Sequence, residues 1–107
     1  MEFMLNDFKW QIRRVDSYSD LLRRSDGSLT VGMTDRDTQM IYLSEDLQGE
    51  FLRKVLCHEI CHSAMFSYSI DMSIEQEELF CDLMATYGSE IINITDGIFK
   101  VLRKRVA

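Results

Sequence analysis

The two histidines of this 107-residue chain lie four positions apart, in the stretch His58-Glu59-Ile60-Cys61-His62. Side chains four residues apart share one face of a helix, so both imidazoles could bind a single Zn²⁺ at about 2.0–2.1 Å. Glu59 would lie about 100° around the helix from His58, beside the metal, where its carboxylate could take a proton from an attacking water. Two histidines placed at random are four apart in about 2% of cases, and a glutamate directly after the first reduces this to roughly 0.14%. The pattern therefore predicts a hydrolytic metal site.

A catalytic zinc site needs a third protein ligand, which in a chain without a third histidine must be Asp, Glu or Cys. Glu78 and Asp82 are four apart in a segment of helical periodicity with apolar neighbours, so both carboxylates should face the core together. The first can bind the metal, and the second can accept a hydrogen bond from the far nitrogen of a bound imidazole. We interpret Glu75 and Glu77, by contrast, as solvated charges that favour the start of the same helix.

The three cysteines, Cys57, Cys61 and Cys81, are an odd number, which argues against a disulfide-stapled domain and favours a reducing compartment. Cys57 and Cys61 each precede a histidine and would point about 100° away from the imidazoles. We interpret all three as small buried apolar residues. Thiolate ligation is the alternative, with Cys81 as fourth ligand of a purely structural zinc site.

The composition limits the class of protein. With 12 Lys and Arg against 18 Asp and Glu, the net charge of −6 disfavours nucleic acid and anionic membranes as partners. The opening residues lack the continuous apolar stretch of a signal peptide, and no apolar run approaches the ~20 residues that span a bilayer. We therefore expect one cytoplasmic domain over residues 1–107, with its oligomeric state left open.

Periodicity along the first part of the chain indicates strands. Residues 9–15 could form a strand or part of a first helix, and residues 16–24 are typical of a short helix. Two β-rich runs at 29–34 and 38–44 are separated by a short polar connection, which predicts an antiparallel pair.

After these strands the periodicity becomes helical. An apolar stripe predicts a helix over about 46–66, which carries both histidines. A second helix should begin at Ser73 and carry the acidic pair, with Gly88 inside it or at its end. Asp96 could cap a last helix that reaches about residue 105. The expected fold class is α+β, with a small sheet packed on the histidine-bearing helix and a second, glutamate-bearing helix.

The HEICH stretch, followed by Glu78-Leu79-Phe80-Cys81-Asp82, resembles the gluzincin metallopeptidases, which pair HExxH with ExxxD on a second helix. The short chain and the β-pair before the first motif are similar to the minimal members, including the ImmA/IrrE-like domains common on phages and other mobile elements. The resemblance implies a zincin-like fold with a small antiparallel sheet. It also implies one Zn²⁺ held by His58, His62 and Glu78, with Asp82 hydrogen-bonded to His58 and Glu59 as the general base.

The resemblance further implies that the chain hydrolyses a peptide bond in a protein substrate, bound as an added strand along a sheet edge formed by residues 38–44. Gluzincins stabilise the oxyanion with Tyr or His, and here Tyr68 and Tyr87 remain open candidates. Two other hypotheses are a regulatory or interaction module that uses zinc only as structure, and a metal-free helical interaction protein. The metal content and the number of protein ligands discriminate these hypotheses.

Overall fold

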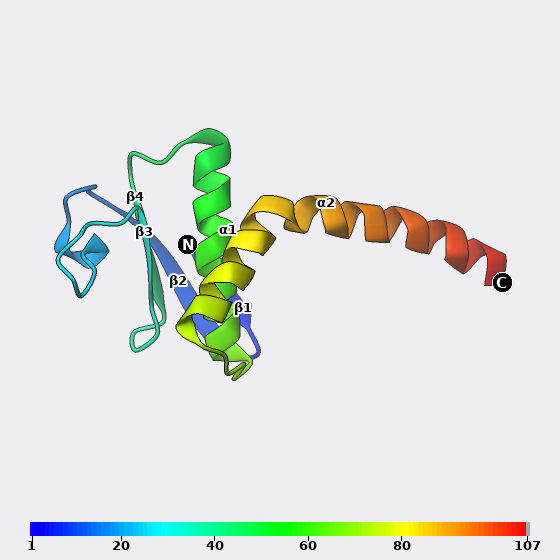
Figure 1. Ribbon diagram of the computed structural model, residues 1–107, viewed down its shortest axis with the longest axis horizontal. Coiled ribbons are helices and arrows are strands. Elements are labelled where there is room, and N and C mark those ends of the chain that lie inside the picture. The colour runs from blue at the N-terminus through cyan, green and yellow to red at the C-terminus, as the bar shows by residue number, and fades with distance from the viewer. Residues whose placement is uncertain (107) are drawn as a thin grey trace.

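The computed structural model describes residues 1–106 as an α+β fold, in which a four-stranded sheet carries two helices on one side (Figure 1). The elements follow one another as β1 (Glu2–Leu5), β2 (Phe8–Val15), the 3-10 helix η1 (Asp20–Leu22), β3 (Gly32–Asp35), β4 (Met40–Ser44), α1 (Gly49–Ser67) and α2 (Ile74–Val106). The α+β class predicted from the sequence is confirmed.

The sheet has the strand order β1-β2-β4-β3. The β3–β4 pair is antiparallel, as predicted, and so is the β1–β2 pair, but β2 and β4 are parallel. The prediction of a wholly antiparallel sheet is therefore wrong. After β2 a long connection leads to β3, which lies at the edge of the sheet. The chain then turns back through β4, which lies between β3 and β2. As a result residues 38–44 do not form an edge, because β4 is paired on both sides, and the two edge strands are β1 and β3.

The hairpin between β1 and β2 is an element that the sequence analysis missed. Its two turn residues, Asn6 and Asp7, have φ angles of 47° and 67°. Positive φ at both central positions is typical of the tight turns that match the twist of paired strands, and Asn and Asp tolerate it. The hairpin is tied to the end of α1, because Asn6 Nδ2 donates to the carbonyl of Ser67 and Trp10 Nε1 donates to Ser67 Oγ, each at 2.8 Å.

Side chains alternate across the sheet, so the two faces bury different residues. One face packs on α1 around a cluster of Trp10, Ile41, Leu43 and Leu47. The other face is covered by the connection that contains η1, through Val15, Leu22 and Tyr42. Only three residues of the segment 16–24 are helical, so the predicted short helix is reduced to η1. Residues 9–15, left open by the sequence, belong to a strand.

The two helices differ from expectation mainly in the length of α2. Helix α1 agrees with the predicted 46–66 to within three residues. Helix α2 follows Ser73, whose hydroxyl accepts from the Gln76 amide while Gln76 Oε1 accepts from the Ser73 amide, both at 3.2 Å. This reciprocal cap sets the helix start. The predicted break and new cap at Asp96 are wrong, because Gly88 lies buried within α2 and the chain has no proline to end the helix.

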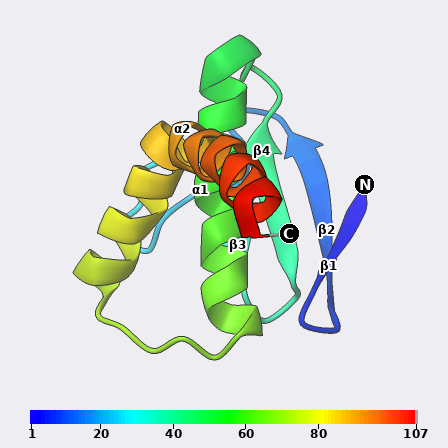
Figure 2. The same ribbon diagram turned by 90° about the vertical axis from the view of Figure 1, so that its right-hand side faces the viewer.

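Helix α2 packs on α1 through its first half only, and its second half projects away from the body (Figures 1 and 2). This arm accounts for the elongated dimensions of 56 × 30 × 28 Å. Within residues 1–106, no helix combines the length and the apolar character needed to cross a membrane.

Candidate metal centre

The two histidines project from one face of α1 toward the first turns of α2. Their Nε2 atoms are 3.1 Å apart. Glu78 of α2 places one carboxylate oxygen 3.2 Å from His58 Nε2 and the other 2.8 Å from His62 Nε2. These three residues form the one group in the described part of the chain whose His, Cys, Asp or Glu ligand atoms converge closely enough to hold an ion. The structure therefore brings together the three residues that the resemblance implied as ligands.

The far nitrogen of each imidazole contacts a second carboxylate. Asp82 Oδ1 lies 2.8 Å from His58 Nδ1, which is the contact expected of Asp82. Glu77 Oε2 lies 2.5 Å from His62 Nδ1. An ionised carboxylate can only accept a hydrogen bond, so each Nδ1 must carry its proton, and a neutral imidazole then presents the lone pair of Nε2.

The donor set fits a divalent cation. With both Nδ1 atoms protonated, two Nε2 lone pairs and a carboxylate converge on one point, and such acceptors repel one another unless a cation or extra protons lie between them. Ligands at 2.0–2.1 Å around a tetrahedral ion are spaced about 3.3 Å apart. The observed spacings of 2.8 to 3.2 Å are close to this value. Nitrogen and carboxylate ligands in this number suit Zn²⁺ with one open position.

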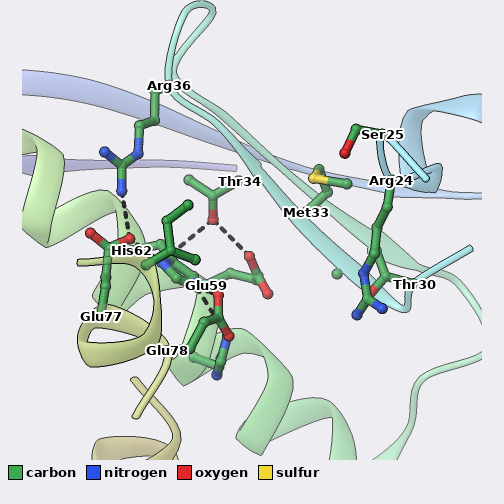
Figure 3. A pocket seen from close by; sticks show the side chains of 13 residues that line it. Arg24, Ser25, Thr30, Met33, Thr34, Arg36, Glu59, His62, Glu77 and Glu78 are labelled. Atoms are coloured by element: carbon green, nitrogen blue, oxygen red, sulfur yellow. Dashed lines mark hydrogen bonds and ion pairs between the residues drawn. The ribbon is translucent and has the colours of Figure 1, made fainter. Parts of the chain in front are cut away.

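Glu77 is a site residue that the sequence analysis interpreted wrongly. Its side chain is buried instead of solvated, and it bridges His62 to Arg36 in the β3–β4 turn, with both nitrogens 2.5 Å from Oε2 (Figure 3). Burial raises the pKa of Glu77, but hydrogen bonds from Arg36 and His62 outweigh burial and hold its pKa below the usual value. The sequence offered a weak signal, since Glu77 lies about 100° from Glu78 on the helix that carries the acidic pair.

Glu59 is buried beside the histidines, with a side chain 7% exposed. Thr34 of β3 donates a hydrogen bond to Glu59 Oε1 at 2.8 Å (Figure 3). Burial raises the pKa of Glu59, and the hydrogen bond from Thr34 and the adjacent imidazoles offset this only in part. Gly32 leaves the room for this carboxylate, because a Cβ there would lie 2.7 Å from Val55 Cγ1 and 3.2 Å from Glu59 Oε2. Neither Thr34 nor Gly32 was identified from the sequence.

The centre opens into a cleft of about 570 Å³ between β3 and the start of α2. The cleft is lined by both histidines, Glu59, Glu77 and Glu78, and on the opposite wall by residues of β3 and of the preceding loop, including Arg24 (Figure 3). Glu78 keeps about half of its side chain exposed, so the centre is accessible from the cleft. Tyr68 and Tyr87, the residues considered for oxyanion stabilisation, are both exposed and do not line this cleft.

The cysteines lie at the junction of the helices and outside the ligand group. Cys61 and Cys81 are buried, Cys57 is half-buried, and all three are free thiols. A hydrogen bond from Cys81 lowers the pKa of Cys61 to about 6. Within residues 1–106, the converging group contains only His58, His62 and Glu78, so Cys81 does not supply a fourth ligand.

No protein-family model, curated protein sequence or solved structure matches this chain. Its function therefore has to be inferred from the geometry of its own residues.

Proposed function

We propose that the chain is a zinc-dependent metallopeptidase with a zincin-like fold, which hydrolyses a peptide bond in a protein substrate. The observation that carries the proposal is the convergence of His58, His62 and Glu78 beside the buried carboxylate of Glu59, at the base of an open cleft. A purely structural site would need a fourth protein ligand. The open position and the adjacent base favour catalysis instead.

Each protein group has a defined part in this reaction. Zn²⁺, when bound, polarises the scissile carbonyl and makes water a better nucleophile. Glu59 accepts a proton from the attacking water and passes it to the leaving amine. The Thr34 hydroxyl holds Oε1 of Glu59, so Oε2 is the oxygen that exchanges the proton. Asp82 and Glu77 keep both imidazoles in the tautomer whose Nε2 can bind metal.

The substrate would bind as an extra strand along β3. Ser44 N donates to Val31 O, one step beyond the Gly32–Leu43 pair that begins the β3–β4 register. Hydrogen-bonded pairs alternate along an antiparallel ladder, so the amides and carbonyls of Gly32 and Thr34 point away from β4. These groups border the cleft and a neighbouring hollow of about 280 Å³, and they are free to pair with an extended peptide.

A zinc-containing regulatory or interaction module is the alternative. It predicts that a fourth protein ligand, such as Cys81, closes the coordination shell. Among the described residues the converging group has three members, and Cys81 is not one of them. The two functions differ in whether a small ligand can reach the metal. A peptide hydroxamate binds zinc through an open position, so it should bind the peptidase and should not bind a closed structural site.

The test is a zinc assay combined with a cleavage assay on a mixture of unstructured peptides read by mass spectrometry. We expect about one zinc per chain, retained in Glu59→Gln and lost in Glu78→Ala. Cleavage should fall at least 100-fold in Glu59→Gln, because the proton acceptor is removed. Glu75→Gln is the matched control, an exposed carboxylate in the same turn of α2. Cleavage by Glu59→Gln at the rate of the unmodified chain would refute the mechanism. Zinc without hydroxamate binding would favour the structural module.

A further inference from the structure

The projecting half of α2 exposes an unusual amount of apolar side chain. Its large hydrophobic residues are each about half exposed; they are Ile91, Ile92, Ile94, Ile98, Phe99, Val101 and Leu102. In the preceding part of α2 the residues that face α1 are buried, among them Cys81, Ala85 and Gly88. Beyond Ser89, where Arg53 of α1 makes its hydrogen bond, the helix leaves the body (Figure 1). A contiguous apolar surface of this kind marks an interaction site.

Four of these exposed residues, Ile91, Ile94, Ile98 and Val101, follow the spacing of a coiled coil, and half-buried Met84 and exposed Tyr87 precede them in the same pattern. Met84, Ile91 and Ile98 recur every seven residues, and Tyr87, Ile94 and Val101 recur three residues after them. Apolar residues at alternating spacings of three and four place one seam along a helix, and such a seam packs against a second helix. The segment 88–104 is about 25 Å long at 1.5 Å per residue, and its seam residues extend over two heptads.

The charges beside the seam point to a specific partner. In this register the positions that flank Tyr87, Ile94 and Val101, three residues after each, are Glu90, Gly97 and Lys104. When two copies of the helix pair antiparallel with Ile94 opposite Ile98, Glu90 of one copy lies opposite Lys104 of the other, at both ends. Gly97 of one copy then lies opposite Gly97 of the other, near the two-fold axis that relates the two copies. A parallel pair would not bring these opposite charges together.

We propose that a second copy of this chain occupies this surface, through a two-fold antiparallel pairing of residues 88–104. The interface is isologous, so each copy offers the same seam and the same two charges. The two folded bodies lie at opposite ends of the paired helices. The inference is independent of the proposed peptidase activity.

A membrane surface fits the arm less well. Amphipathic helices that lie on membranes carry a strongly basic polar face. Here the charges from residue 90 to residue 104 are Glu90, Asp96, Lys100, Arg103 and Lys104, a net of +1, on a chain of net charge −6. The mixed charges favour a helix of the same kind over an anionic lipid surface.

The first test is the mass of the full chain in solution, by sedimentation or light scattering, from 1 to 100 µM. We expect a species near twice the 12.6 kDa of one chain. Ile94→Asp should remain monomeric at 100 µM, because it buries a charge in the seam. Asn93→Asp adds the same charge about 100° around the helix and should still dimerise. Circular dichroism verifies that both variants keep their helix content. A monomer at 100 µM in the unmodified chain overturns the proposal, and its binding to anionic vesicles would assign the surface to lipid instead.

The second test addresses the antiparallel register by reversing charges. Glu90→Lys should weaken the dimer at least tenfold at low salt, since each end then brings two lysines together. Lys104→Glu should do the same, and the double variant should return to the affinity of the unmodified chain. Single reversals that leave the affinity unchanged would overturn the antiparallel register.

Discussion

At the scale of single residues, the proposed metal centre depends on carboxylates that lie outside the group of three candidate ligands. Glu77 and Asp82 each fix the proton on Nδ1 of one histidine, and so present Nε2 toward Glu78. Glu77 is the more constrained of the two, since it is buried and also bound by Arg36, whereas two thirds of the Asp82 side chain is exposed. A hydrogen bond in water is weaker than the same bond in a buried site, so Glu77 should orient its imidazole more strictly.

We therefore expect Glu77→Gln to weaken zinc binding by about 10- to 100-fold, the usual cost of losing such an orienting carboxylate. The glutamine retains the volume of the side chain and loses the charge that favours a protonated Nδ1. Competition with a chromophoric chelator measures the affinity. Glu75→Gln, in the same helical turn and exposed, should bind zinc as the unmodified chain does. Equal affinities for the two variants would show that the contact between Glu77 and His62 has no orienting role.

At the scale of elements, the site depends on the close approach of the edge strand β3 to α1. Thr34 reaches the carboxylate of Glu59, and Gly32 lies against Val55 on the neighbouring turn of α1. Any side chain at position 32 would move either the strand or the helix. Strand and helix together therefore set the position of the proposed base, which neither element determines alone.

We expect Gly32→Ala to destabilise the fold by about 1–3 kcal/mol, the usual cost of overpacking, because its Cβ would be 2.7 Å from Val55 Cγ1. Urea denaturation measures this change in the free energy of unfolding. Combining it with Val55→Ala removes the methyl group that clashes, so the double variant should be more stable than the sum of the two single losses indicates. Strictly additive losses would mean that the strand moves away from α1 and that Val55 is not the obstacle.

At the scale of the whole molecule, the proposed metal centre would join two parts of the chain. The histidines belong to α1, which packs on the sheet, while Glu78 belongs to α2, whose packing within the described chain is mainly against α1. A cation bound by all three would hold α2 in place. Since an unfolded chain does not assemble these ligands, the free energy of cation binding would add to the stability of the folded state.

We expect zinc at 100 times its dissociation constant to stabilise the folded state by about 2.7 kcal/mol, which raises Tm by at least about 10 °C in a domain of this size. Thermal unfolding with zinc and with a chelator measures the shift. Glu78→Ala should abolish it, and Glu75→Ala should retain it. A Tm that does not depend on zinc would exclude a site that joins the helices.

The sequence alone determined the features that depend on local order. The spacing of His58 and His62 and of Glu78 and Asp82 predicts two helices with a pair of polar side chains on one face of each, because helical geometry relates residues four apart wherever a helix occurs. The bounds of α1 and the antiparallel β3–β4 pair also followed from periodicity.

Which elements meet depends on the folded chain and not on local sequence order. Strand order depends on contacts between residues far apart in the chain, so the parallel β2–β4 pairing and the edge position of β3 had no local signal. The role of Glu77 likewise depends on Arg36, 41 residues away, and that of Glu59 on Thr34. Helical periodicity predicts that α2 has an apolar face, but only the fold shows that α1 covers half of it and leaves the rest exposed.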